Sequence, residues 1–285
     1  HPVADSLLMR RALEYASMFN MPVINHCEDP SLKGDGAANE GYNASVLGLR
    51  GIPGAAESIM VERDVSLSEL TGGHVHVAHM SSRGSLRAVR SGKDRDVSVT
   101  CEVTPHHLVL TDESLSYDTN FKMNPPLREI ADRDAMIQGL VDGSIDVIAT
   151  DHAPHHVDEK SVEFDSAPFG IVGIETAVPL VLDRLLHTGT LSLSRIIELL
   201  AVNPARVLGL EAGGLQVGKP ADITFLSPES TVEISAAAFR SKGRNTPFDG
   251  WRLQGAVAGT MVRGRMVYKA SGVTGAEALG EVAAS

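Results

Sequence analysis

The sequence IDVIATDHAPH, residues 145–155, is the most informative about the fold. An apolar run rich in β-branched residues ends there in an acid, Asp151, which is followed by His152, Pro154 and His155. Such a run is typical of a buried parallel strand, and the polar side chains that follow it lie at the carboxyl end of that strand. We therefore asked whether other strand-like runs end in the same way.

Two further runs do. VINHCE at 23–28 carries His26, and VHVAHMS at 75–81 carries His79. Imidazole nitrogens and carboxylate oxygens are the ligands that zinc takes, and a catalytic zinc site keeps one position open for water. Each residue alone is more simply interpreted as part of a core or a turn. Their recurrence at three strand ends predicts a metal site formed by His26, His79 and Asp151.

The bulk composition indicates a soluble globular protein. The chain has 285 residues, of which 43% are hydrophobic and 21% charged, and its net charge is −11. With no basic cluster, nucleic acid and anionic membranes are poor partners. No apolar run approaches the ~20 residues of a membrane span. Cys27 and Cys101 lie in apolar runs, which favours buried free thiols in a reducing compartment such as the cytoplasm.

The order of the expected elements predicts an α/β fold. Helices are expected over 5–20 (with Asp5 as N-cap), 57–70 (with a possible break at 64–66), 85–91, 133–142, 174–187 and 192–201, and strands over 23–28, 75–81, 97–103 and 145–151. Residues 105–131 and the stretch up to 173 are expected to be loops. Strands that alternate with helices form a parallel sheet with helices outside. A closed (β/α)8 barrel needs eight strands, so four strands predict an incomplete TIM barrel, its second half.

The character of the sequence changes after residue 210, where short strands and Gly-rich turns replace the helices. We expect the half-barrel over 1–209 and a small β subdomain over 210–270. The small, acidic tail over 271–285 is expected to be frayed.

Several other polar residues are candidates for substrate contact. Asn124 precedes two prolines and offers a fixed amide, although a turn asparagine is the simpler interpretation. His155 lies in the loop after Asp151, and the backbone of Phe169 and Gly170 either donates N–H groups to a ligand or forms a plain turn. Asp151 has a possible second role, because a carboxylate beside an activated water can accept its proton.

The remaining histidines are expected to support the fold. His74 and His76 share one face of the expected strand, and His79 would point to the other face. His106 and His107 are expected to be structural or to support the ligands rather than to bind metal.

Taken together, these motifs resemble the long-chain dihydroorotases of the amidohydrolase superfamily, from residue 1 to about 268. The motifs that carry the resemblance are HCED at 26–29, HVAH at 76–79, EVTPHH at 102–107, KMNPPLR at 122–128, ATDHAPH at 149–155, PFG at 168–170 and GKPAD at 218–222. The resemblance implies an amidohydrolase-type barrel that holds two zinc ions in the intact site. It makes His26 and His79 metal ligands and Asp151 both a ligand and the general acid/base. It makes Asn124, His155, Phe169 and Gly170 substrate contacts.

The family's first half, with a His-x-His-x-Arg motif and a metal-bridging acid, has no counterpart in this sequence. The expected explanation is an incomplete gene fragment, which alone would bind zinc weakly and be inactive.

The activity that the resemblance implies is the reversible hydrolysis of the cyclic amide of dihydroorotate to N-carbamoyl-aspartate in pyrimidine biosynthesis. One alternative is another cyclic amidase, such as a dihydropyrimidinase, hydantoinase or allantoinase, against which the loop at 123–126 argues. A second alternative is a non-catalytic partner of aspartate transcarbamoylase, against which the retained His26, His79 and Asp151 argue. A homodimer and a complex with aspartate transcarbamoylase are both expected possibilities.

Overall fold

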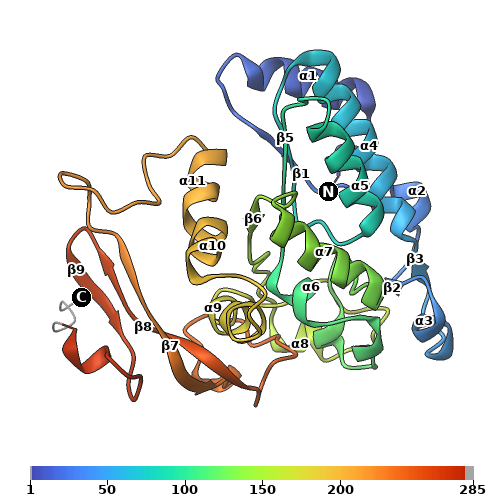
Figure 1. Ribbon diagram of the computed structural model, residues 1–285. Helices are drawn as coiled ribbons and strands as arrows, with labels where there is room; N and C mark the ends of the chain where they lie inside the picture. Colours follow the sequence, from blue (N-terminus) through green and yellow to red (C-terminus); the bar gives the residue numbers. More distant parts are fainter. Residues whose placement is uncertain (1, 280–285) are drawn as a thin grey trace.

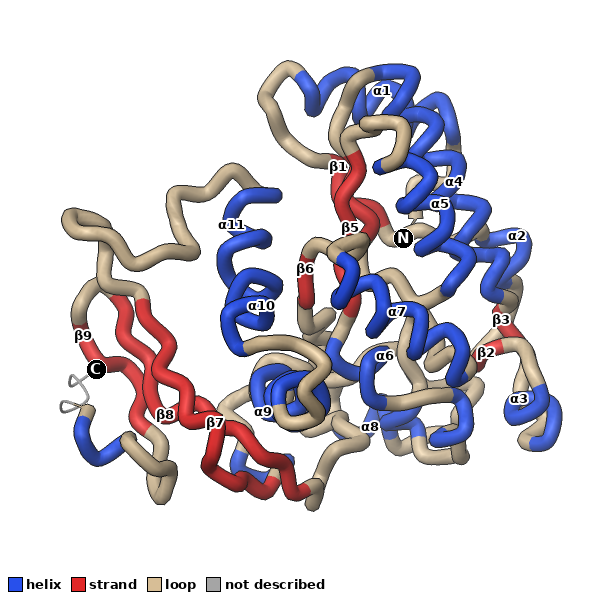
Figure 2. The backbone as a smooth tube through the Cα atoms, in the orientation of Figure 1, coloured by secondary structure: helices blue, strands red, loops and turns tan. Residues whose placement is uncertain are grey.

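The computed structural model describes residues 2–279 and is built around a parallel sheet (Figures 1 and 2). Its strands are β1 (Val23–Asn25), β4 (Val75–Val77), β5 (Val99–Val103) and β6 (Val147–Ile148), in the order β1-β4-β5-β6. All three neighbouring pairs are parallel. The predicted four-stranded parallel sheet is therefore confirmed, but β1, β4 and β6 are shorter than expected.

Four long helices pack on this sheet: α1 (Ser6–Ser17), α4 (Gly54–Thr71), α5 (Arg83–Lys93) and α7 (Ile130–Asp142). The side chain of Asp5 caps α1 by accepting from the N–H of Leu8, as predicted. The break expected in α4 is absent, because the buried Asp64 accepts hydrogen bonds from Asn25 and Arg63 and does not compete for the helix backbone. Figure 1 shows α1, α4, α5 and α7 together on one side of β1 and β5.

The core between these layers is formed by apolar side chains from every long element. Met9 and Leu13 of α1, Val61 of α4, Val89 of α5 and Leu140 of α7 are all completely buried. Val75, Val77, Cys101 and Val103 meet them from the sheet. Both cysteines are buried free thiols, as expected. This packing fixes the strand ends, and hence the loops that follow them.

Short elements fill the regions between the strands. They are α2 (Pro30–Lys33), β2 (Ala38–Asn39), α3 (Tyr42–Val46), β3 (Gly51–Ile52), α6 (Pro105–Val109), η1 (Asp112–Ser114), η2 (Thr119–Phe121) and α8 (Val157–Lys160). Two stretches expected to be irregular thus contain the short helices α6 and α8. Thr104 and His156 cap these helices with their side chains.

Two helical segments follow. The first joins α9 (Ala177–Val181) to the π-helical turn η3 (Leu182–Leu186). The second joins α10 (Leu193–Ile197) through the π-helical turn η4 (Glu198–Val202) to α11 (Asn203–Val207). Both expected helices are present, and the second extends beyond its predicted end to Val207.

The C-terminal region forms a second, antiparallel sheet. Its strands β7 (Ile223–Glu233), β8 (Arg252–Val262) and β9 (Arg265–Lys269) lie in the order β7-β8-β9, with η5 (Ala236–Ala238) after β7. β8 packs closely on the half-barrel, because a Cβ atom at Gly255 would come within 2.4 Å of the Cβ atom of Leu182. The boundary after residue 209 remains a prediction.

The expectation of a frayed tail is wrong for residues 271–279. This segment contains η6 (Ala276–Ala278), and Val273 and Ala276 are buried against Ala256 and Ala258 of β8. Small apolar side chains on both partners allow this close packing. Residues 280–285 lie outside the described residues. Within residues 2–279, none of the helices is both long and apolar enough to cross a membrane.

Candidate metal centre and active site

Two of the predicted ligands, His26 and His79, lie side by side at the carboxyl end of the parallel sheet. His26 directly follows β1 and His79 lies two residues after β4, and these strands are neighbours. Nδ1 of His26 is 3.0 Å from Nε2 of His79. Two nitrogen ligands of one tetrahedral zinc ion, each at about 2.0–2.1 Å from the metal, would be about 3.3 Å apart. The two nitrogens therefore fit the ligand spacing of a shared metal ion.

The backbone at this end of the sheet is unusual. His79 has a φ of 36° and Asp151 a φ of 47°, both in the left-handed region that residues other than glycine rarely adopt. Because β4 ends at Val77, the expected alternation of faces does not extend to His79, so that part of the strand prediction is wrong. The left-handed backbone turns the chain sharply where a ligand is needed, which is typical of functional sites.

The charge state of His79 suits metal binding. Burial lowers the pKa of His79 below its ordinary value, and His26 acts in the same direction, whereas the charge of Asp151 opposes both. The ring is therefore neutral at pH 7, the state in which imidazole binds metals. Nδ1 of His79 is buried and has no hydrogen-bond partner among the described residues.

A carboxylate orients the other histidine. Nε2 of His26 is 3.4 Å from an oxygen of Glu28, which in turn pairs with the ammonium of Lys33 at 3.0 Å. Burial alone would raise the pKa of Glu28, but hydrogen bonds from His26 and Lys33 hold it at about 2. A carboxylate that accepts from the second ring nitrogen of a histidine is the usual support of a metal ligand.

The third predicted ligand, Asp151, lies at the same end of the sheet but does not form a three-ligand cluster with the two histidines. It is exposed and follows β6, so it lies at the same end of the sheet as the two histidines. Its charge acts on His79. Within residues 2–279, however, no three His, Cys, Asp or Glu side chains are close enough together to hold a metal ion. The structure thus brings together two of the three predicted ligands and places the third nearby.

Asn124 lies beside the histidine pair. Its Nδ2 is 3.4 Å from Nε2 of His26, and its Oδ1 is buried without a hydrogen-bond partner in the described part of the chain. A narrow cavity between His26, Glu28, Asn124 and Arg128 adjoins this amide. A buried polar atom without a partner is rare and needs an explanation, such as a ligand or an ion.

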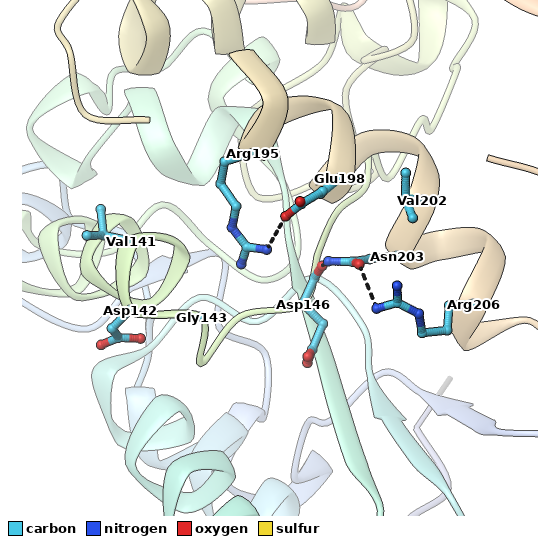
Figure 3. Close-up of a pocket in the computed structure, with 9 residues that line it drawn as sticks. All are labelled: Val141, Asp142, Gly143, Asp146, Arg195, Glu198, Val202, Asn203 and Arg206. Carbon is cyan, nitrogen blue, oxygen red and sulfur yellow. Dashed lines mark hydrogen bonds and ion pairs between the residues drawn. The ribbon is translucent and has the colours of Figure 1, made fainter. Parts of the chain in front are cut away.

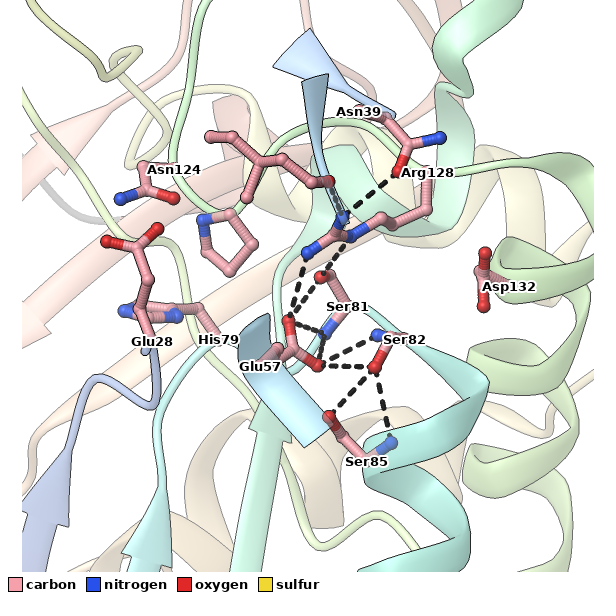
Figure 4. Close-up of polar contacts among 12 residues, drawn as sticks. Glu28, Asn39, Glu57, His79, Ser81, Ser82, Ser85, Asn124, Arg128 and Asp132 are labelled. Carbon is pink, nitrogen blue, oxygen red and sulfur yellow. Dashed lines mark hydrogen bonds and ion pairs between the residues drawn. The ribbon is translucent and has the colours of Figure 1, made fainter. Parts of the chain in front are cut away.

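A buried ionic network holds the loop that carries Asn124 (Figure 4). Glu57 of α4 accepts hydrogen bonds from the backbone N–H groups and hydroxyls of Ser81 and Ser82. Arg128 donates to Oγ of Ser81 at 3.1 Å and lies 3.9 Å from Glu57. The sequence analysis did not find this network, since a buried carboxylate inside a helix has no local sequence signal.

His155, Phe169 and Gly170 lie together in neighbouring loops. Nε2 of His155 is 2.9 Å from the carbonyl oxygen of Phe169, to which it donates. The N–H of Gly170 donates to the carbonyl of Lys122 at 3.0 Å, so this group is already used within the chain. The N–H of Phe169 makes no hydrogen bond to any described residue. Of the two backbone donors predicted to contact a ligand, only that of Phe169 remains available.

The other histidines support the site instead of forming it. His76 lies 3.1 Å from a carboxylate oxygen of Glu102, and the other oxygen of Glu102 accepts from the backbone N–H of His79. Nε2 of His107 donates to the carbonyl of Pro125, directly after Asn124. The contact of His107 agrees with the structural or supporting role that the sequence predicted for it, whereas the contact between His76 and Glu102 was not predicted.

A second cavity, of about 440 Å³, lies at the opposite end of the strands (Figure 3). It is lined by polar side chains that include Asp146, Arg195, Glu198, Asn203 and Arg206. Asp146 directly precedes β6, so this cavity is separated from the candidate site by the length of the sheet. None of the predicted site residues lines it.

The half-barrel and its paired histidines at the strand ends define a hydrolase fold with known relatives. Residues 3–267 match the model of the Amidohydrolase family, and the chain belongs to this family. The expected amidohydrolase-type α/β fold is thereby confirmed.

The similar curated proteins are more specific. A dihydroorotase of Geobacter sp. (strain M21) is 53% identical over 270 residues, and a dihydroorotase of Pelotomaculum thermopropionicum is 53% identical over 269 residues. Each alignment covers 94% of this chain and 63% of the relative. The chain therefore spans less than two thirds of the length of the relatives that it matches.

A solved structure supports the fold. The L-hydantoinase (dihydropyrimidinase) from Arthrobacter aurescens superimposes with a TM-score of 0.82 at 26% identity. The superposition covers 94% of this chain and 62% of the hydantoinase chain. The fold of this chain is thus shared with most of the matched part of that protein.

Proposed function

We propose that the protein to which this chain belongs is a dihydroorotase, which interconverts dihydroorotate and N-carbamoyl-aspartate. The observation that carries the proposal is the pair of histidines, His26 and His79, at two neighbouring strand ends, with their nitrogens 3.0 Å apart. The relatives named dihydroorotase support it, because they match 94% of the chain at about half identity.

The residues of this chain fit a metal ion. His26, oriented by Glu28, and His79 would hold it, and Asp151 would approach as a third ligand. Zinc, as a pair of ions in the whole protein, suits imidazole and carboxylate donors. When bound, zinc polarises a carbonyl group and makes a water molecule acidic enough to attack it at neutral pH.

The chain's own residues supply proton transfer and positioning. Asp151 is exposed at the strand end and is proposed to accept the proton of the attacking water and to return it to the ring nitrogen that departs. The unpartnered Oδ1 of Asn124 and the free N–H of Phe169 are proposed to bind the polar edge of the ring. His155 donates from its Nε2 to the carbonyl of Phe169 and so holds the backbone of Phe169 beside the site.

A hydantoinase or dihydropyrimidinase activity is the second candidate, because the superimposed structure has that name. The decisive experiment compares the hydrolysis of dihydroorotate, dihydrouracil, hydantoin and allantoin by the full-length, zinc-loaded protein. We expect turnover of dihydroorotate that exceeds that of the uncharged rings by at least about a hundredfold. Preferential turnover of dihydrouracil, hydantoin or allantoin would overturn the proposal, as would a loaded protein that is inactive on all four.

The finer biological setting is also proposed. Dihydroorotate hydrolysis belongs to pyrimidine biosynthesis in the cytoplasm, and a homodimer or a complex with aspartate transcarbamoylase is the expected assembly. Sedimentation of the full-length protein, alone and with aspartate transcarbamoylase, tests both assemblies. A monomer that does not bind aspartate transcarbamoylase would rule out both assemblies.

A further inference from the structure

Two side chains outside the predicted site connect the loops that carry its substrate contacts. They are Lys160, at the end of α8, and Asn245, which lies between β7 and β8. Both are buried, with 8% and 5% of their surface exposed. We asked what two buried polar side chains from such distant parts of the sequence do at this place.

Lys160 gathers carbonyl groups from two loops. Its ammonium donates to the carbonyl oxygens of Pro168 at 2.9 Å and Gly170 at 3.1 Å, and it lies 3.4 Å from that of Lys122. The first two flank Phe169, and the third is two residues from Asn124. One ammonium group therefore joins the two segments proposed to contact the ring.

Asn245 holds the same loops through its side-chain amide, and we refer to Lys160 and Asn245 together as the clamp. Its Nδ2 donates to the carbonyls of Ala153 at 2.9 Å and Gly170 at 3.0 Å, and its Oδ1 accepts from the N–H of His155 at 3.1 Å. The three hydrogen bonds of this amide are all directed at the two loops after β6. Its own carbonyl accepts from the N–H of Val172.

The setting of Lys160 argues for a specific role. Buried lysines are almost always paired with an acid, yet no carboxylate in the described chain lies within 4.0 Å of this ammonium. Its charge is held by backbone dipoles alone. A leucine or methionine at this position would leave the carbonyl oxygens of Pro168 and Lys122 without this donor, so the lysine is needed to hold these segments together.

Close packing leaves the clamped segment little freedom. Gly170 has a φ of 129°, and a Cβ atom there would come within 2.5 Å of the Cβ atom of Ala153. The loop of Gly170 and the loop of His155 thus touch directly. Any shift of one loop moves the other.

We propose that Lys160 and Asn245 are positioning residues that fix the Phe169–Gly170 backbone and His155 as one wall of the ring-binding site. The carbonyl of Pro168 and the N–H of Phe169 belong to one planar peptide group, so the bond from Lys160 to this carbonyl also fixes the direction of the N–H that is proposed to bind the ring. A displacement of about 1 Å at a positioned contact is costly for an enzyme, because the substrate is then no longer held in the productive geometry. The kinetic part of this inference rests on the proposed function, whereas the structural part does not.

The structural part is tested by hydrogen exchange of the full-length protein and its variants Lys160→Met and Asn245→Asp. We expect the amides of Ala153, Gly170 and Val172 to exchange at least about tenfold faster in both variants, as for the loss of hydrogen bonds to a charged or amide donor. The amides of β5 should keep their protection. Unchanged exchange over 153–172, or an equal increase over the whole chain, would overturn the clamp.

Lys93→Met is the matched control. Lys93 also donates to a backbone carbonyl, that of Ser144 at 2.9 Å, but it lies at the opposite end of the sheet. Its replacement should leave exchange over 153–172 unchanged. Faster exchange there in this control as well would show that the effect is general, which contradicts a local clamp.

The kinetic part is tested with dihydroorotate. We expect Lys160→Met to raise KM by about tenfold or more while the zinc content stays unchanged. Lys160→Arg should restore most of the affinity. Loss of zinc, or a fall in kcat alone, would contradict a role in ring binding. If no variant or wild type turns over dihydroorotate while the exchange results hold, the proposed function fails and the clamp stands.

The pH profile gives an independent signature. Burial, together with the nearby charge of Lys122, lowers the pKa of Lys160 to about 8, and Asp118 acts in the opposite direction. The protonated ammonium has three donors for its three carbonyls, and the neutral amine has two. KM should therefore rise above about pH 8 in the wild type and stay low in Lys160→Arg, since arginine remains charged. An identical alkaline rise in both proteins would speak against the clamp.

Discussion

The two ends of the parallel strands are built in opposite ways. At the amino end, Lys93 donates to both carboxylate oxygens of Asp146 at 2.8 Å, and Asp146 also accepts from the N–H of Cys101. At the carboxyl end lie the only two buried side-chain atoms that lack a hydrogen-bond partner among residues 2–279, Nδ1 of His79 and Oδ1 of Asn124. Each buried polar atom without a partner needs an explanation, and both of them lie at the carboxyl end, on side chains of the candidate site.

Residues with a left-handed backbone occur at both ends of the strands, but in different settings. His79 and Asp151, at the carboxyl end, are in the left-handed region. At the amino end the left-handed Asp96 is an exposed turn residue before β5. In a barrel of this type, catalysis belongs to the carboxyl face and stability to the amino face. Mutations of comparable residues at the two ends test whether this division holds.

The largest effect is expected for Asp151→Asn in the full-length protein. Asparagine keeps the shape and tolerates the left-handed backbone, but it cannot accept a proton. The turnover of dihydroorotate should fall by roughly 10²–10⁴-fold, the usual contribution of a general base, with Tm unchanged. The matched control is Asp96→Asn, which should leave turnover intact. Equal activity of the two variants would refute the role of Asp151.

Glu57→Gln should produce the largest loss of stability. Removing the carboxylate leaves Arg128 charged and buried, and breaking a buried ion pair in this way costs about 3–5 kcal/mol of unfolding free energy. Glu69, which pairs with Arg95 on the surface, is the control, and Glu69→Gln should cost about 1 kcal/mol or less. Denaturant unfolding at pH 7 measures both. Equal losses would mean that Glu57 and Arg128 do not act as a buried pair.

The same pair predicts an acid dependence. Burial on its own would raise the pKa of Glu57, but Arg128 and the serine donors hold it below its ordinary value. A lowered pKa in the folded state stabilises the protein above the unfolded value of about 4.3. This stabilisation is lost as the pH falls through the lower folded value. The stability difference between wild type and Glu57→Gln should therefore be full at pH 7 and shrink in acid.

A smaller effect is expected for the polar contacts between the neighbouring strands β4 and β5, which we call the polar ladder. These contacts reach from the amino end of the strands to the carboxyl end. At the carboxyl end, Glu102 accepts from the N–H of His79, and at the amino end His74 contacts Thr100 at 2.8 Å. Glu102→Gln should weaken zinc binding by about 10–100-fold, as is usual for residues that support metal ligands. His74→Gln should leave zinc affinity unchanged. Competition with a chelator, measured on the full-length protein, separates the two; a loss in both variants would mean that the ladder acts as a whole.

The sequence predicted the candidate site better than its surroundings. The β-branched runs mark the strands, and the polar residues that follow them must lie at one edge of a parallel sheet, so His26, His79 and Asp151 could be placed at the same end. The left-handed backbone of His79 had no such signal, because it depends on the Glu102 contact from a neighbouring strand. The pattern therefore extended β4 too far.

Residues that act over long sequence distances were missed for the same reason. Asn245 is 90 positions away from His155, and Glu57 is 24 positions away from Ser81, with nothing in either local sequence to mark the contact. The frayed tail was mispredicted because small residues carry little hydrophobic signal, although Ala276 packs well against another alanine-rich surface. Contacts of this kind become visible only in the folded chain.

The smallest effect is expected for a mutation at the amino end of the strands. It is the strictest test of whether the two ends act independently. Lys93→Met removes a half-buried ion pair with Asp146, which should cost about 1 kcal/mol of unfolding free energy. Asp146 keeps its bond from the N–H of Cys101, so β5 and β6 should remain paired. Turnover and zinc affinity should therefore equal those of the wild type, measured beside Glu102→Gln. A fall in zinc affinity in Lys93→Met would mean that the two ends of the sheet are coupled, since a change at the amino end would then reach His79 through the strands.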